Sequence, residues 1–205
     1  MTKIKMCGLK RMTDILHVNE IQPEYAGFVF AKTSKRYVEP EDAEVFRKAL
    51  SPDIEVVGVF VDEPVSNVID LLKREVIDIA QLHGSEDVEY IARVKEETGK
   101  QVIKVIRMEA MFRKGRTLTE EMAEYPGSDY FLIDSGAGSG RTFDWNLLKG
   151  IDRPYFLAGG LNPDNVREAV TKLHPYCVDV SSGIESGGQK DKNKMVAFAD
   201  AVRRN

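Results

Sequence analysis

Eight short runs of β-branched, aromatic and other apolar residues recur along the chain, and most are separated by a segment with helical periodicity. A chain that alternates strand with helix forms βαβ units, whose strands pair in parallel. The runs cover residues 4–7, 25–30, 55–61, 77–82, 101–107, 130–134, 155–158 and 177–181. Eight such units without a break in composition predict an α/β fold, a single (β/α)8 TIM barrel over residues 1–205. An open, doubly wound sheet is the alternative, because alternation alone does not prove closure.

Start signals for helices precede several of the intervening segments. Asn162 is expected to cap a helix whose first residue is Pro163, where a missing N–H costs nothing. Ser85 precedes two acidic residues and is expected to cap another helix. Glu39-Pro40 and Glu63-Pro64 predict two further helix starts. The segments after the first, fifth and sixth strands carry weaker helix signals.

The overall composition is that of an ordinary globular protein, with 42% hydrophobic and 30% charged residues. A net charge of −4 with both signs scattered gives no basic patch for nucleic acid or for a membrane surface. The first residues lack the apolar core of a signal peptide, so we expect a cytoplasmic protein with small-molecule partners. Its two cysteines, Cys7 and Cys177, belong to no Cys/His cluster, which predicts no structural zinc.

Chemically active residues follow the carboxyl ends of the predicted strands, the edge at which barrel enzymes build their active sites. A thiol, carboxylates, guanidinium groups and glycine turns at one edge predict a site for an anionic, oxygen-rich small molecule. The residues at these ends are Cys7, Ser34 with Arg36, Asp62, His83, Arg107, Asp134, Gly159-Gly160 and Ser181-Ser182-Gly183.

Small residues follow the last two strands. Gly159 and Gly160 come after the seventh strand, and Ser181, Ser182 and Gly183 after the eighth. They leave backbone N–H groups open to close approach by an anion, and phosphate sites of barrels commonly lie in these two loops. The alternative is that the glycines only turn the chain. We favour a phosphate site.

Cys7 ends the first strand, with Lys3 and Lys5 on the same strand. It is either a buried structural thiol, which packs like a small hydrophobe, or a reactive thiol supported by positive charge. Strand alternation points both lysines to the same side as Cys7, although a barrel interior normally packs apolar side chains. The lysines either lie near the site or pair with an inward-facing acid, and the sequence leaves the choice open.

Asp134 leaves the apolar sixth strand, either to cap the following turn or to donate a proton. Arg36 is either a solvated surface charge or a bidentate clamp for a carboxylate. For His83 we favour a hydrogen-bonded structural role over a catalytic one. The glycine-rich segment 136–142 is interpreted as a mobile lid, because its spacing fits neither a P-loop nor a dinucleotide fingerprint.

Taken together and in this order, the motifs resemble those of the phosphoribosylanthranilate isomerase family, which acts in the biosynthesis of tryptophan, an aromatic amino acid. The resemblance covers essentially the whole chain. The matching segments are KMCGL at 5–9, GFVF at 27–30, SKRYV at 34–38, VGVFV at 57–61, QLHG at 81–84, LID at 132–134, TFDW at 142–145, AGGLNPDNV at 158–166 and DVSSGIE at 179–185.

The resemblance implies an Amadori rearrangement of N-(5-phosphoribosyl)anthranilate to 1-(2-carboxyphenylamino)-1-deoxyribulose 5-phosphate, without cofactor or metal. It assigns Asp134 as the general acid that opens the ribose ring and Cys7 as the general base that removes the C2 proton. By the same resemblance Arg36 holds the anthranilate carboxylate. The phosphate falls to the loops at Gly159-Gly160 and from Asp179 through Ser181 and Ser182 to Gly183. Lys35 stands where the family commonly has proline, a change in the loop that presents Arg36.

Three rival functions remain on the residues alone. A sugar-phosphate epimerase would favour metal ligands, which His83 with scattered acids does not supply. The histidine-pathway isomerase of a related aminoaldose has an aspartate where this chain has Cys7. A phosphosugar-binding regulatory module would keep the phosphate loops without turnover. We expect a monomer, and a dimer through the loops or helices is the alternative.

Overall fold

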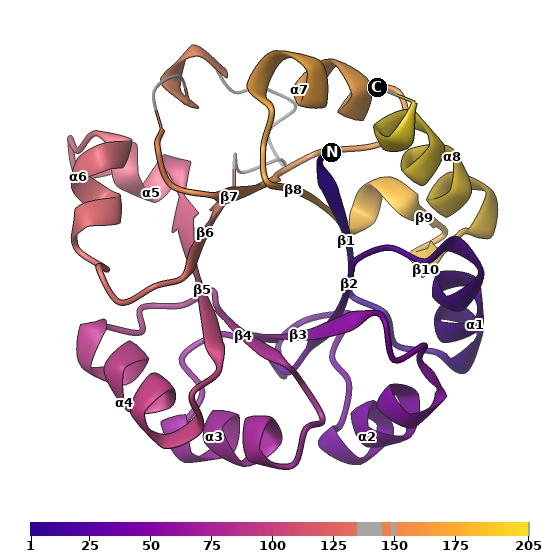
Figure 1. Cartoon of the computed structure of the whole chain (residues 1–205), viewed down its shortest axis with the longest axis horizontal. Helices are drawn as coiled ribbons and strands as arrows, with labels where there is room; N and C mark the ends of the chain where they lie inside the picture. The colour runs from indigo at the N-terminus through magenta and orange to yellow at the C-terminus, as the bar shows by residue number, and fades with distance from the viewer. Residues whose placement is uncertain (135–144, 149–150, 205) are drawn as a thin grey trace.

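Eight parallel strands form a closed barrel in the computed structural model, which describes residues 1–134, 145–148 and 151–204 (Figure 1). Strand β1 pairs with both β2 and β8, and this double pairing closes the ring. The predicted TIM barrel is therefore confirmed, and the open-sheet alternative is wrong. The strands are β1 (Lys3–Cys7), β2 (Tyr25–Val29), β3 (Glu55–Phe60), β4 (Ile79–Leu82), β5 (Gln101–Arg107), β6 (Tyr130–Asp134), β7 (Tyr155–Ala158) and β8 (Cys177–Val180).

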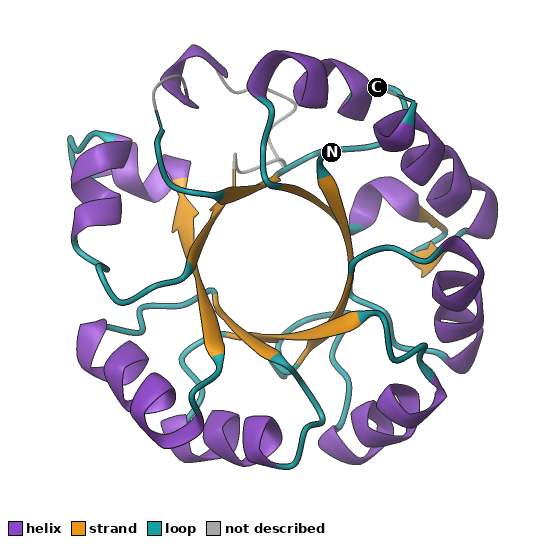
Figure 2. Cartoon of the chain, viewed as in Figure 1, coloured by secondary structure: helices purple, strands orange, loops and turns teal. Residues whose placement is uncertain are grey.

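Helices surround the strands as an outer layer (Figure 2). Two short helices follow β5, and a small antiparallel hairpin, β9 (Glu185–Ser186) with β10 (Gln189–Lys190), lies between β8 and the last helix. The helices are α1 (Met12–Ile21), α2 (Pro40–Ala49), α3 (Val65–Lys73), α4 (Val88–Thr98), α5 (Met108–Arg113), α6 (Leu118–Ala123), α7 (Val166–Leu173) and α8 (Lys192–Arg203), with the 3-10 turns η1 (Trp145–Leu148) and η2 (Ser182–Ile184).

Helix starts follow the sequence signals in part. Helix α2 begins at Pro40 as predicted. Helix α4 is capped by Asp87, which accepts a hydrogen bond from the Tyr90 backbone N–H, and so the predicted cap at Ser85 is wrong. Helix α7 begins three residues after Pro163, because the Asn162 side chain instead caps a preceding turn. Within the described residues, no helix is long and apolar enough to cross a membrane.

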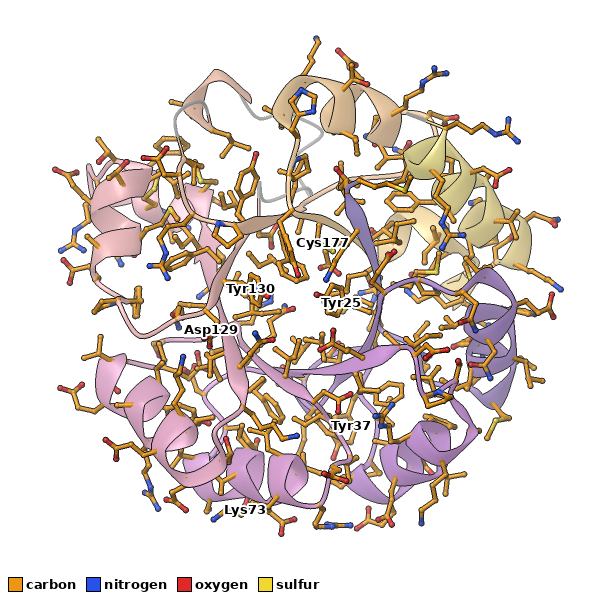
Figure 3. The ribbon with its side chains drawn as sticks, in the orientation of Figure 1. Tyr25, Tyr37, Lys73, Asp129, Tyr130 and Cys177 are labelled. Carbon is orange, nitrogen blue, oxygen red and sulfur yellow. The ribbon has the colours of Figure 1, made fainter. Side chains whose placement is uncertain are left out.

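Strand alternation divides the buried side chains into two layers. One layer lies between the strands and the helices and contains most of the apolar core. The other fills the barrel and contains Tyr25, Val57, Ile103, Leu132, Phe156 and Cys177, which come from strands alone. Figure 3 shows Tyr25, Tyr130 and Cys177 inside the ring of strands. A packed interior leaves the strand ends as the place for a site.

The amino-terminal end of the barrel is closed by polar groups. The Lys3 ammonium donates to the phenol oxygens of Tyr25 at 3.1 Å and Tyr176 at 2.7 Å. The ring of Tyr130 stacks on that of Tyr176, with centroids 5.0 Å apart. Lys3 is thus satisfied at the end of β1 opposite Cys7, so it borders the barrel rather than the thiol.

Candidate active site

A cavity of about 590 Å³ opens at the carboxyl ends of the strands. Sites for small ligands are commonly of this size, roughly 300 to 1,000 Å³. One predicted site residue, Gly183, lies outside the cavity lining, and a side chain at this position would collide with the Leu161 carbonyl oxygen. The predicted site residues that line the cavity are Cys7, Arg36, Asp134, Gly159, Gly160, Asp179, Ser181 and Ser182.

The Cys7 thiol lies beside a buried ion pair. Lys5 has no exposed side-chain surface, and its Nζ atom lies 2.9 Å from Asp179 Oδ1. The same ammonium also hydrogen-bonds to Cys7. Burial alone would lower the pKa of Lys5, but the charges of Asp179 and Cys7 raise it above its ordinary value, which keeps this lysine protonated. Lys5 therefore both pairs with an inward acid and contacts the thiol.

Burial and charge act in opposite directions on Cys7. Burial raises the pKa of the thiol, Lys5 lowers it, Asp179 raises it and Lys190 lowers it, and the net result is a pKa above the ordinary thiol value. The protein without ligand therefore holds Cys7 mainly as a thiol near neutral pH. The small fraction of Cys7 that is present as thiolate is strongly basic and is the form that accepts a proton.

Asp134 lies next to a histidine that the sequence did not link to it. His83 Nε2 is 3.6 Å from Asp134 Oδ2, and both side chains are about a quarter exposed. His83 lies at the end of β4, where the sequence placed it, and lines the cavity. Gln81, also on β4, lines the cavity with a buried Oε1 atom that has no hydrogen-bond partner among the described residues. That oxygen is available to accept a hydrogen bond from a ligand.

Arg36 is held by an acid from the opposite end of the sequence. Its Nε and Nη2 atoms donate to the two carboxylate oxygens of Glu185, at 2.7 and 2.9 Å. Burial would raise the pKa of Glu185, but Arg36 and Lys190 lower it to about 2. Sequence reasoning missed both Glu185 and Lys190, because no local signal connects the hairpin with the loop after β2.

The two loops predicted to bind phosphate lie side by side along the cavity. Gly159 and Gly160 have φ of 97° and 68°, a backbone region that residues with a Cβ rarely adopt. Ser181 follows β8, and its carbonyl and hydroxyl oxygens accept hydrogen bonds from Lys190 at 2.9 and 3.3 Å. The first turn therefore has a backbone conformation that favours glycine, and a buried cation supports the second.

Two further expectations concern groups around the cavity. Among the described residues, no set of three or more His, Cys, Asp or Glu side chains lies close enough to hold a metal ion. The predicted lid, residues 136–142, lies outside the residues that the structure describes.

A barrel that gathers a thiol, a carboxylate and a guanidinium around glycine-rich turns at its carboxyl edge defines a TIM-barrel enzyme for a small anionic ligand. A sequence model of the N-(5'phosphoribosyl)anthranilate (PRA) isomerase family matches residues 4–201. The chain therefore belongs to the phosphoribosylanthranilate isomerase family, the isomerases of tryptophan biosynthesis, as its motifs predicted.

Individual relatives agree with this membership over their whole length. The N-(5'-phosphoribosyl)anthranilate isomerase of Endomicrobium trichonymphae is 46% identical over 203 residues, 99% of either chain. The crystal structure of the Thermotoga maritima phosphoribosyl anthranilate isomerase is 35% identical, with a TM-score of 0.86 and complete coverage of both chains. A further isomerase structure, 33% identical with a TM-score of 0.84 and complete coverage of both chains, holds reduced 1-(o-carboxyphenylamino)-1-deoxyribulose 5-phosphate.

Proposed function

We propose that this chain converts N-(5-phosphoribosyl)anthranilate into 1-(2-carboxyphenylamino)-1-deoxyribulose 5-phosphate, with Asp134 as general acid and Cys7 as general base. The observation that carries the proposal is that these two side chains, from β6 and β1, line one cavity. The ligand of the related isomerase, a reduced form of the proposed product, supports the choice of substrate.

The reaction needs one proton donor and one proton acceptor. Asp134 donates a proton to the ribose ring oxygen, the C1–O bond breaks, and the nitrogen lone pair forms a protonated Schiff base. Cys7, as thiolate, removes the C2 proton, and the electron pair of the C–H bond neutralises the Schiff base to give an enolamine. Loss of the hydroxyl proton at C2 and gain of a proton at C1 yield the ketone. Each of the two groups is expected to contribute about 10²- to 10⁴-fold in rate.

The remaining cavity residues fit the two anionic ends of this substrate. The turns at Gly159-Gly160 and Ser181-Ser182 line the cavity, and backbone N–H groups of these turns would bind the phosphate. Asp179 and Gly183 shape the turn at Ser181-Ser182: Asp179 through its ion pair with Lys5, and Gly183 by its close packing against Leu161. Arg36, which reaches the cavity from the loop after β2, is available to the anthranilate carboxylate.

Loss of anthranilate-type fluorescence during turnover of the named substrate tests the proposal. We expect Cys7→Ser and Asp134→Asn to lower kcat by roughly 10²-fold or more with little loss of stability. Matched controls are Cys177→Ala, a buried thiol of the same barrel, and Asp129→Asn, just before β6 at its other end; both should keep wild-type kcat. Near wild-type turnover in Cys7→Ser or Asp134→Asn would refute the assigned roles. Binding without conversion by the wild type would favour the regulatory module instead.

A further inference from the structure

The hairpin after β8 delivers a buried ion pair to the edge of the cavity. Glu185 on β9 and Lys190 on β10 face each other across the hairpin register, with Nζ 2.8 Å from Oε1. The side chain of Lys190 is 1% exposed and that of Glu185 is 11% exposed, although neither lies in the apolar core. A charge buried this completely is costly unless its hydrogen bonds are made. The hydrogen-bond partners of Glu185 and Lys190 therefore indicate which parts of the site this ion pair supports.

The partner of Glu185 is the guanidinium of Arg36. A guanidinium carries five donors in a planar fork, and the Nε and Nη2 donors on one edge already bind Glu185. No hydrogen bond from the described part of the chain occupies the Nη1–Nη2 edge, which is the edge that a second carboxylate would bind. The ammonium of Lys190 adds one positive charge, so the cluster of Arg36, Glu185 and Lys190 contains two cations and one anion.

The alkyl stem of Arg36 is fixed as well. Gly8, directly after Cys7, has φ of 79°, and a Cβ atom there would collide with Arg36 Cδ. The stem therefore crosses the backbone immediately after β1 at close range. With its stem against Gly8 and its inner edge on Glu185, the guanidinium has one orientation relative to the cavity.

Lys190 connects this arrangement with the opposite end of the site. Besides Glu185, its ammonium donates to the carbonyl and hydroxyl oxygens of Ser181. One buried cation thus holds both the acid behind Arg36 and the turn proposed for phosphate. Burial lowers the pKa of Lys190, and Glu185 partly offsets that effect.

We propose that Glu185, anchored by Lys190, is a positioning residue that orients Arg36 toward the carboxylate of the substrate. The inference rests on the proposed function, because it takes the carboxylate role of Arg36 from there. Glu185 itself does not touch the ligand; it acts by holding the guanidinium edge that does.

The test compares two ligands that differ only in the carboxylate. One is reduced 1-(o-carboxyphenylamino)-1-deoxyribulose 5-phosphate, and the other is its counterpart made from aniline. Calorimetry gives both dissociation constants for the wild type and for Arg36→Met, Glu185→Gln and Lys190→Met. Lys194→Met is the matched control, because that exposed lysine also bonds to Glu185, but only to its backbone carbonyl.

We expect Glu185→Gln and Lys190→Met to weaken binding of the carboxylated ligand about tenfold, the equivalent of about 1.4 kcal/mol. Binding of the aniline-derived ligand should change less than about twofold in Glu185→Gln, and Lys194→Met should match the wild type for both ligands. Circular dichroism checks that each variant is folded, and Glu185→Gln decides the test if Lys190→Met does not fold.

Two results would overturn the inference while leaving the proposed function intact. In the first, Glu185→Gln binds both ligands as the wild type does. In the second, Glu185→Gln binds both ligands more weakly by the same factor. Either result counts provided that Arg36→Met weakens binding of the carboxylated ligand more than that of the aniline-derived ligand. If Arg36→Met does not discriminate, the carboxylate role of Arg36 fails, and with it both the inference and that part of the proposed function.

Discussion

Replacement of Lys5 by methionine tests whether the buried lysine supports the Cys7 thiolate. Methionine has a similar length and fills the same space without charge. Lys5 has no exposed side-chain surface and Asp179 only 11%, so the substitution leaves an almost buried carboxylate unpaired. Breaking a buried pair from one side costs about 3 to 5 kcal/mol, and we expect about 3 kcal/mol because Asp179 keeps some contact with solvent.

The effect on the thiol follows from the same contacts. The thiolate loses a charge-assisted hydrogen bond, worth roughly 1.5 to 3 kcal/mol. At 1.36 kcal/mol per pKa unit, that loss raises the Cys7 pKa by roughly one to two units beyond its already raised value. Asp179→Asn should do the opposite, because it leaves the charge of Lys5 uncompensated beside the thiol. The double variant should return both stability and pKa toward the wild type.

The pH dependence of iodoacetamide alkylation measures the thiol directly, and urea unfolding measures stability. Peptide mass analysis separates Cys7 from Cys177, the other free cysteine, which is fully buried. The assay needs no substrate, so its outcome does not depend on Cys7 being the catalytic base. An unchanged alkylation midpoint in Lys5→Met, or a shift of the same sign in Asp179→Asn, would show that Lys5 does not support the thiolate.

Three further predictions concern other contacts of the barrel. Gly8→Ala should lower the free energy of unfolding by about 1 to 2 kcal/mol, because this position has a positive φ. The new methyl group also displaces Arg36, so calorimetry should show weaker binding of the carboxylated product analogue. Unchanged affinity would contradict the close packing of Arg36 on Gly8. The pKa of Glu185 is about 2 in the folded protein, against an ordinary value of 4.5, so its ion pairs stabilise the fold by about 1 to 2 kcal/mol after allowance for screening. This stabilisation is present above pH 4.5 and lost toward pH 2. Urea unfolding should therefore show the difference in unfolding free energy between wild type and Glu185→Gln shrinking over that range, and a constant difference would argue against it. Lys104→Met should lower the free energy of unfolding by about 3 to 5 kcal/mol, because it leaves the carboxylate of Glu86, a side chain only 1% exposed, without its cation. The double variant Lys104→Met/Glu86→Gln should recover most of that loss. Equal losses of unfolding free energy in the single and double variants would count against a coupled pair.

Much of the architecture could be predicted because its signals are local. The strands that begin at Gln101, Tyr130 and Tyr155 have the predicted bounds, since a buried strand is readable from a short apolar run with turn residues around it. The others end within one residue of the prediction, and β4 begins two residues after it, at Ile79. Helix starts were less reliable where several capping residues compete, as Asp87 displaced Ser85 and Asn162 capped a turn rather than a helix.

Membership of the candidate site was also readable, because parallel strands of a barrel end at one edge. That rule placed Cys7, Arg36 and Asp134 together without any knowledge of distances, and all three line the cavity. The catalytic roles of Cys7 and Asp134, the monomeric state and the cytoplasmic location stay predictions.

The sequence by itself determined the eight strands, their order and the edge at which the chemistry lies, because hydrophobic period and turn residues act over a few neighbouring positions. Only the tertiary structure decided the partners: Asp179 for Lys5, Glu185 for Arg36 and His83 for Asp134. These pairs join residues far apart in the chain. The first forms when β1 pairs with β8, the second when the hairpin after β8 reaches the loop after β2, and the third when β4 and β6 end at the same edge of the barrel. Closure and register set those distances, and neither is encoded in any short stretch of sequence.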